Sequence, residues 1–585
     1  MRRRPARALA AVLGAAALGA VAVGAAPVAA APFAPKAPEP ASPGARDGSF
    51  ATFGRTLPGR GRLLVTFADR PTAAEAGVRL GGVGDVVPVL PEAGIWGVEP
   101  DDPPGARRQV LPLPGVASAE WSLARSAGAR PRPLAPLALP PPPLFEDPLF
   151  RPGVQWGLFR NWRPELTGLA PRPRIAILDT GIDAGHEEWR GDPAALAEPR
   201  SSVRNSSEAA DWSTSGHGTH VAGIAAAPAN GIGVVGVAPA SSEGAQLIPV
   251  QITDPVGNSD DDTIIRGIRW AVRHGAKVIN ISSGGEGYTR AFRDTVFWAT
   301  GRGALIVAAV GNEGDSINSL NYPAAFPKVL GVGAQCDENV SADCPEPYGA
   351  ALFSNYNRSV DLIAPGVDVA SSVPVAIHER EVAPGYALKT GTSMAAPYVT
   401  GVAALVQASN GNRLSPYQLL RQLLNTATDT GPRGLDRRSG HGIINPGAAV
   451  TLRAPADDHD EVNDDIKFLG KGQRAKERVR RQVIEATIDA FDDREDVYPV
   501  VLRAGERVTI TLRHSRARLR LYFWRPGTRT VATAGGNGDT NVLRYDGRKG
   551  RKAVTARAPS TGRYYVNVYA QSGRTAYRLS ITRSS

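Results

Sequence analysis

Short apolar runs alternate with helical patterns over the central part of the chain, residues 147–450. The runs that predict buried strands lie at residues 175–178, 247–252, 278–281, 305–310 and 360–364. Between two of them, residues 264–272 keep helical spacing, with Asp262 near the start and Gly275 just past the end. Strand, helix and strand in close succession predict an α/β domain with a doubly wound parallel sheet. In such sheets functional side chains gather at the carboxyl ends of the strands.

A separate pattern precedes this domain and predicts a small α+β unit over residues 49–125. Its strand-like or helix-compatible stretches lie at residues 63–67, 72–80, 86–90, 95–98 and 116–121. Residues 126–146, which follow, are rich in proline and predict an extended, accessible linker.

After the α/β domain the pattern changes twice. Residues 451–490 are charged and polar and predict a junction. From residue 491 to 585, short strand-like segments separated by Gly, Asp and Pro predict an antiparallel β-sandwich. The segments lie at residues 497–502, 508–512, 519–524, 564–569 and 577–581.

The composition is that of globular protein, with 42% hydrophobic and 21% charged residues among 585. It excludes wholesale disorder, collagen and a polytopic membrane protein. The net charge of +11 is unevenly spread, with +12 on residues 491–585, +4 on residues 1–48 and −5 on the rest. We therefore expect no nucleic-acid partner for the α/β domain. The basic C-terminal region could bind anionic cell-envelope polymers, and a solvated, solubilising surface is the alternative.

The N-terminus has the pattern of a secretory signal peptide over residues 1–31. Arg2, Arg3, Arg4 and Arg7 precede an uncharged run over residues 8–35, in which three small residues at 29–31 offer a cleavage site. The alternative is an uncleaved membrane anchor, but Pro27 and Pro32 interrupt the run. We expect an extracellular protein.

The chain has two cysteines, Cys336 and Cys344, in a polar segment. For an exported chain they predict one small local disulfide, with two free thiols as the alternative.

Three segments carry the groups of a nucleophilic hydrolase. Asp179 ends a predicted strand, and His217 lies between Gly216 and Gly218. Ser393 directly precedes an apolar stretch that predicts a buried helix, so its hydroxyl is expected at a helix N-terminus. Taken singly, the aspartate and serine could be caps, and His217 with His220 could be metal ligands. Their order and context together favour catalysis, and we expect His220 and Asp183 to be structural.

These segments resemble the subtilisin-like serine proteases, the subtilase family, over residues 147–450. The similarity continues through residues 311–314, 322–323, 353–354 and 363–366. The resemblance implies a secreted serine endopeptidase that acts on proteins or peptides, and we expect a monomer. It implies that Ser393 is the nucleophile, His217 the general base, Asp179 its orienting carboxylate and Asn312 an oxyanion donor.

The resemblance also implies a substrate groove and a structural calcium ion. Ser283, Gly284 and Gly285 match the segment that pairs with an extended substrate, and Ser283 replaces the usual leucine. Glu188 and Asn230 match calcium-ligand positions, although Asn230 could equally be a turn residue. No cofactor is expected for the chemistry itself.

The flanking units resemble domains that accompany such enzymes. Residues 49–125 resemble inhibitory prodomains, which implies a self-processed zymogen that carries its own intramolecular inhibitor; a permanent N-terminal domain is the alternative. The sandwich resembles domains behind secreted bacterial peptidases. A second hypothesis, of another class, is an adhesive protein that acts through this basic sandwich while its protease-like domain is incidental.

Overall fold

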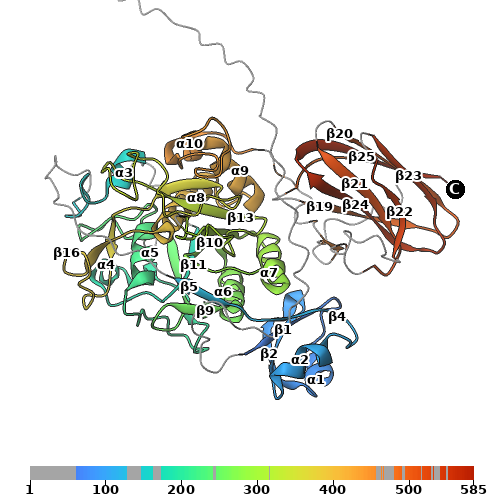
Figure 1. Cartoon of the computed structure of the whole chain (residues 1–585), viewed down its shortest axis with the longest axis horizontal. Helices are drawn as coiled ribbons and strands as arrows, with labels where there is room; N and C mark the ends of the chain where they lie inside the picture. Colours follow the sequence, from blue (N-terminus) through green and yellow to red (C-terminus); the bar gives the residue numbers. More distant parts are fainter. Residues whose placement is uncertain are drawn as a thin grey trace, which may run out of the picture. The chain divides into compact units, whose positions relative to one another are not determined.

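The computed structural model (Figure 1) describes residues 61–127, 146–161, 173–240 and 245–584. Within the last range it leaves out residues 315, 456, 458–462, 464, 467–468, 470–479, 491–493, 515–516, 529–530, 532–540 and 549–550. The predicted signal peptide and most of the predicted proline-rich linker lie outside the described residues. In the part of the chain that is described, no helix combines the length and apolarity needed to cross a membrane.

The centre of the α/β domain is a seven-stranded parallel sheet in the order β14-β13-β12-β10-β6-β8-β7. The strands are β6 (Arg174–Asp179), β7 (Arg200–Ser201), β8 (Gln246–Gln251), β10 (Ala276–Ile281), β12 (Leu305–Ala309), β13 (Val329–Gln335) and β14 (Leu362–Pro365). The predicted doubly wound α/β fold is confirmed. Strand β13 was not predicted, because Gly331 and Gly333 interrupt its apolar pattern.

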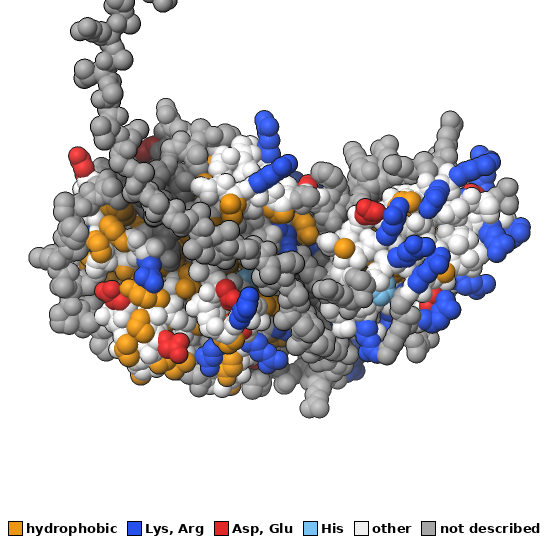
Figure 2. Space-filling view, turned by 90° about the horizontal axis from the view of Figure 1, so that it is seen from above, with side chains coloured by type: hydrophobic (Ala, Val, Ile, Leu, Met, Phe, Trp, Pro, Cys, Tyr) orange, Lys and Arg blue, Asp and Glu red, His pale blue; other side chains and the backbone are white. Residues whose placement is uncertain are grey.

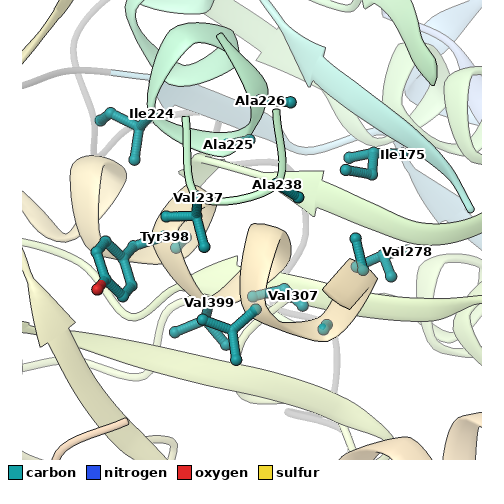
Figure 3. Packing of buried hydrophobic residues seen from close by; sticks show 14 of the residues in the cluster. Ile175, Ile224, Ala225, Ala226, Val237, Ala238, Val278, Val307, Tyr398 and Val399 are labelled. Carbon is teal, nitrogen blue, oxygen red and sulfur yellow. The ribbon is translucent and has the colours of Figure 1, made fainter. Parts of the chain in front are cut away.

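Helices cover both faces of this sheet. The helices of the domain are α3 (Trp156–Asn161), α4 (Glu187–Arg190), α5 (His217–Ala226), α6 (Asp261–Arg273), α7 (Arg290–Thr300), α8 (Thr392–Ser409), α9 (Pro416–Thr426) and α10 (Pro446–Thr451), and α5 to α9 contact strands of the sheet. Ile175 and Ile177 pack in a cluster with residues of α5, α8 and α9, whereas Ala176 and Leu178 pack with residues of α6 and α7. Figure 3 shows Ile175, Val278 and Val307 beside Ala225, Ala226 and Val399. Burial of both faces explains why the strands are continuous apolar runs.

The N-terminal unit is an antiparallel sheet in the order β2-β3-β1-β4 with two helices. Its elements are β1 (Leu63–Phe67), α1 (Ala73–Leu80), β2 (Gly84–Leu90), β3 (Ile95–Pro100), α2 (Pro103–Val110) and β4 (Val116–Trp121). Leu63, Val65 and Phe67 form its own core, while Leu64 and Ile95 pack with residues of α6 and α7.

One strand lies partly in the predicted linker. β5 (Ala124–Ala127) is the middle strand of a small sheet, between β11 (Ser283–Gly284) and β9 (Asn258–Asp260). The expected boundary between unit and linker after residue 125 is therefore wrong. These four short-side-chain or polar residues have no strand pattern of their own, and their conformation is set by the two partner strands.

The C-terminal region is the predicted antiparallel sandwich, with sheets β18-β25-β20-β23 and β19-β24-β21-β22. Its strands are β18 (Arg481–Asp489), β19 (Glu495–Leu502), β20 (Arg507–His514), β21 (Arg518–Trp524), β22 (Val542–Asp546), β23 (Lys552–Arg557), β24 (Gly562–Ser572) and β25 (Arg574–Ser584). The predicted boundary at residue 491 is wrong, because β18 pairs along its whole length with β25. β18 is an edge strand in which Ile484 and Ile488 are buried while Val483 is exposed and most other residues are charged or polar, so its sequence shows no clear apolar run.

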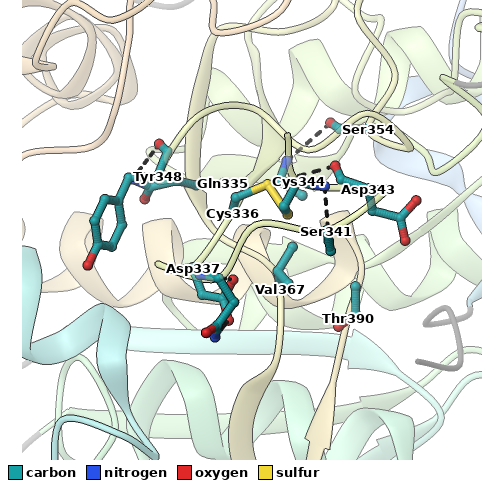
Figure 4. The surroundings of a disulfide bond; sticks show 12 residues. Gln335, Cys336, Asp337, Ser341, Asp343, Cys344, Tyr348, Ser354, Val367 and Thr390 are labelled. Atoms are coloured by element: carbon teal, nitrogen blue, oxygen red, sulfur yellow. Dashed lines mark hydrogen bonds between the residues drawn. A yellow bond between two sulfur atoms is a disulfide. The ribbon is translucent and has the colours of Figure 1, made fainter. Parts of the chain in front are cut away.

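The predicted disulfide is confirmed. Cys336 and Cys344 are bonded with an S–S distance of 2.07 Å, and both are fully buried (Figure 4). The bond closes a loop that follows β13.

Candidate active site

The predicted catalytic residues come from one edge of the central sheet. Asp179 is the last residue of β6, and Asn312 follows the end of β12, two strands away. His217 is the first residue of α5, and Ser393 is the second residue of α8. Asp179 and Asn312 thus lie at the carboxyl ends of strands, and His217 and Ser393 lie in the first turns of helices. This is the edge at which functional residues are expected in an open α/β sheet.

Asp179 and His217 form a buried pair. Nδ1 of His217 lies 2.7 Å from Oδ1 of Asp179, and each residue is 1% exposed. Asp179 Oδ1 also accepts a hydrogen bond from the backbone N–H of Thr180, which fixes the carboxylate. Because a carboxylate oxygen can only accept, Nδ1 carries a proton in this contact, and Nε2 is the ring nitrogen that remains for other contacts. Among the described residues Nε2 has no hydrogen-bond partner, so its lone pair is available.

Ser393 is held through Ser282, which directly precedes the predicted groove residues and was not expected to contact Ser393. The hydroxyl of Ser393 donates to the carbonyl oxygen of Ser282 at 3.1 Å, and the hydroxyl of Ser282 donates to the carbonyl of Ser393 at 2.9 Å. Asn280 Nδ2 donates to the Ser282 hydroxyl at 2.9 Å. The structure therefore brings Ser393 to the sheet edge but does not hydrogen-bond it to His217.

Asn312 is oriented by the first turn of α8. Its Oδ1 accepts from the backbone N–H and the hydroxyl of Thr392, at 2.9 and 3.0 Å. Because the amide is planar, its NH₂ group points away from Thr392. The side chain can therefore donate beside Ser393 while its oxygen stays occupied.

The predicted groove residues lie in and beside β11. Ser283 pairs with Ala127 and Gly284 with Ser126, antiparallel, so β5 takes the place expected for an extended peptide. Gly285 instead pairs with Tyr322. A Cβ atom on Gly284 would lie 2.7 Å from Oδ1 of Asn321, which explains the need for glycine there.

The predicted calcium ligands meet around one loop. Glu188 is fully buried; its Oε1 accepts from the backbone N–H of Val234 at 2.8 Å, and its Oε2 has no hydrogen-bond partner among the described residues. Burial raises the pKa of Glu188 to about 8, and the nearby charge of Asp147 adds to the effect. Asn230 donates to the backbone carbonyl of Glu188 at 3.0 Å, and its Oδ1 accepts from the N–H of Ile232.

Asp147, which the sequence did not indicate, binds the same loop. Its Oδ1 accepts from the backbone N–H groups of Asn230 and Gly231, and burial raises its pKa. Two carboxylates near one loop, one with an unpartnered oxygen, fit a hard cation. Among the described residues no cluster of three His, Cys, Asp or Glu side chains suits a metal, so main-chain oxygens would have to complete the site.

His220 and Asp183, which we expected to be structural, each contact main-chain groups. His220 is fully buried, its Nε2 lies 3.0 Å from the carbonyl of Ala387, and burial lowers its pKa well below the usual value. Asp183 caps a turn through the N–H of Gly185.

Comparisons with known proteins agree with this geometry. Residues 172–442 match the model of the subtilase family. The chain is 36% identical over 304 residues to subtilisin Savinase from Lederbergia lenta, covering 51% of this chain and 98% of that protein. It is 37% identical over 304 residues to M-protease from Shouchella clausii strain KSM-K16, covering 51% and 70%.

A solved structure resembles most of the chain. The crystal structure of fervidolysin from Fervidobacterium pennivorans, a keratinolytic enzyme related to subtilisin, matches with a TM-score of 0.53 over 85% of each chain, at 21% identity. In sequence, fervidolysin is 35% identical over 296 residues, which cover 47% of this chain and 40% of that protein.

Proposed function

The chain belongs to the subtilase family and is a serine endopeptidase, and from this premise we propose that Ser393, His217 and Asp179 form its catalytic triad. The observation that carries the proposal is the buried contact of 2.7 Å between Asp179 and His217, at the sheet edge where Ser393 lies in the first turn of α8. Substituting Ser393 by Ala should abolish casein hydrolysis while the protein stays folded.

The proposed chemistry is acyl transfer to the Ser393 hydroxyl. Nε2 of His217 takes the hydroxyl proton as Oγ attacks the peptide carbonyl carbon, and the imidazolium returns the proton to the leaving amine. Water then attacks the acyl group by the same route, releases the acid and restores Ser393. Asp179 keeps the proton on Nδ1 and stabilises the imidazolium.

Asn312 would stabilise the negative charge that develops on the carbonyl oxygen. In this proposal its NH₂ group acts together with the backbone N–H of Ser393, which belongs to the first turn of α8. Donors of this kind act on the transition state because they are already oriented when charge appears.

Substrate binding would also release the nucleophile. A peptide that follows the register of β5 and continues one residue past Ala127 brings its N–H opposite Ser282. That N–H competes with the Ser393 hydroxyl for the Ser282 carbonyl, and the displaced hydroxyl can turn to Nε2 of His217.

We propose further that the protein is a secreted zymogen whose N-terminal unit blocks the groove. The proposal is supported by β5, which occupies both edges where a substrate strand would pair. Glu92 binds Arg269 at 2.9 Å, and Glu120 accepts from the backbone N–H of Arg290 at 2.8 Å. Because the unit and α6 share a core, its release requires cleavage and dissociation. A full-length Ser393→Ala chain should retain it.

A structural calcium ion is proposed at the loop of residues 230–234. Glu188 and Asp147 would hold it together with main-chain oxygens, and the ion would neutralise two buried carboxylates. Binding of Ca²⁺ by the catalytically silent Ser393→Ala protein, lost in Glu188→Gln, tests this role.

A second function is proposed for the sandwich, namely retention on anionic cell-envelope polymers. Figure 2 shows Lys and Arg side chains gathered over this region, in agreement with the net charge of +12 on residues 491–585. Clustered positive charge attracts polyanions and loses strength as salt rises.

A further inference from the structure

A buried arginine joins β5 to the α/β domain. The side chain of Arg125 is 0% exposed, although arginine is almost never fully buried without a partner. Its Nε donates to Oδ1 of Asp261 at 2.8 Å, and the Asp261 side chain is also 0% exposed. The charge of Arg125 is thus neutralised by one carboxylate of α6.

The rest of the guanidinium is matched by carbonyl oxygens. Nη1 donates to the carbonyls of Gly285 and Glu286 at 2.7 and 2.9 Å, and Nη2 donates to the carbonyl of Gly287 at 3.0 Å. The ring of Phe292 lies beneath, with its centroid 5.7 Å from Cζ of Arg125. A planar fork of donors fits these acceptors, whereas a lysine ammonium could reach only part of them.

The pocket itself belongs to the α/β domain. Asp261 begins α6, and its Oδ2 accepts from the hydroxyl of Thr289 at 2.7 Å, which fixes the carboxylate independently of β5. The three carbonyls come from the segment that follows β11. When β5 leaves, one carboxylate and three carbonyls therefore remain around a space shaped for a guanidinium.

The register relates this pocket to the nucleophile. Arg125 pairs with Ser259 and Ala127 with Ser283, so the next residue of a peptide in the same register lies opposite Ser282, the partner of the Ser393 hydroxyl. If that residue supplies the attacked carbonyl, the side chain in the Arg125 pocket belongs to the fourth residue before the scissile bond.

We propose that Asp261 and the carbonyls of residues 285–287 form a subsite that selects substrates with arginine at the fourth position before the cleaved bond. This inference rests on the proposed catalytic role of Ser393. An apolar side chain there would leave the Asp261 carboxylate buried without a cation, which is the main source of discrimination. Asp261 is a specificity-determining residue and takes no part in bond cleavage.

The test uses the self-processed enzyme and internally quenched peptides of otherwise identical sequence. The fourth position before the cleaved bond carries Arg, Lys or Leu, and a further peptide moves the Arg to the third position so that the total charge is unchanged. We expect kcat/KM for the Arg peptide to exceed that for the Leu peptide by at least about tenfold. Lysine should be intermediate, and the displaced Arg should give no gain.

Two variants test whether the preference for arginine depends on Asp261. Asp261→Asn should reduce the Arg-to-Leu ratio to near one, whereas Asp262→Asn should keep it, because Asp262 binds Arg62 and Arg266 instead. Equal kcat/KM for the Arg and Leu peptides in an enzyme that reacts with a fluorophosphonate would overturn the subsite and leave the triad standing. Failure to cleave any peptide or to react with the fluorophosphonate would overturn the catalytic proposal itself.

Discussion

The hydroxyl of Ser393 donates to the carbonyl oxygen of Ser282 at 3.1 Å, directly before β11, the strand that would bind the substrate backbone. In the proposed mechanism the nucleophile is therefore held by the residue that precedes β11, and Nε2 of His217 has no hydrogen-bond partner among the described residues. We therefore expect substrate binding to activate Ser393, because the substrate N–H and the Ser393 hydroxyl would compete for the carbonyl oxygen of Ser282.

Loss of the Asn312 amide should slow the chemical step. We expect Asn312→Ala to lower kcat by about 10²–10³ with little change in KM, because the donor acts on the developing oxyanion and much less on the bound substrate. Steady-state hydrolysis of a peptide substrate measures both constants. A variant whose KM rises while kcat is unchanged would show that Asn312 binds substrate instead.

Glu188 should make the stability of the protein depend on pH. Its folded pKa of about 8 lies above the usual 4.5, so between these values the folded state binds more protons than the unfolded state. The free energy of unfolding should therefore fall as pH rises from about 4.5 to about 8, by at most about 5 kcal/mol. Calcium should offset the fall because it binds the ionised form.

Urea denaturation of the Ser393→Ala protein at pH 5 and pH 8, with EDTA or with Ca²⁺, measures this dependence without self-digestion. In EDTA, the free energy of unfolding should fall less between pH 5 and pH 8 in the Glu188→Gln variant than in the parent protein. If Glu188→Gln leaves the pH dependence of the free energy of unfolding in EDTA unchanged, the proposed role of this carboxylate is refuted.

Removing Arg125 from the unprocessed chain should destabilise it strongly. In the Ser393→Ala background, Arg125→Ala leaves Asp261 buried without its cation, and we expect a loss of about 3–5 kcal/mol in the free energy of unfolding. Arg79→Ala is a matched control, because Arg79 and Asp69 form a partly exposed pair within the N-terminal unit. It should cost about 0–1 kcal/mol. Similar losses in both variants would contradict the account of the interface.

The basic sandwich should hold the full chain on an anionic matrix at low salt and release it as salt rises. A chain truncated after residue 479 should not be retained on the matrix at low salt. The truncation must also remove β18, because that strand pairs with β25. Unchanged retention of the truncated chain would assign the binding to another surface.

The sequence predicted those parts of the fold whose residues carry their own pattern. Strands such as β6 and β12 carry apolar residues on both faces, so their runs are easily recognised in the sequence. β13 was missed because it contains Gly331, where a Cβ atom would lie 1.9 Å from the carbonyl oxygen of Ser359. β5 was missed because its extended conformation depends on pairing with β9 and β11.

The candidate site likewise contains residues that the sequence indicates and residues that only the tertiary structure reveals. Asp179, His217, Ser393 and Asn312 stand in recognisable segments, so sequence alone could nominate them. Asp147 and Asp261 were not indicated, because their contacts are with residues distant in the sequence, such as the contact of Arg125 with Asp261, 136 residues apart. Such roles follow only from the tertiary fold.

The most direct test of the central claim is fluorophosphonate labelling of the processed enzyme, with the modified residue mapped by peptide mass spectrometry. We predict a single label on Ser393, lost in His217→Ala, together with loss of casein hydrolysis and retention of the N-terminal unit in Ser393→Ala. A Ser393→Ala protein that is still labelled, still hydrolyses casein and still shortens normally would contradict the account.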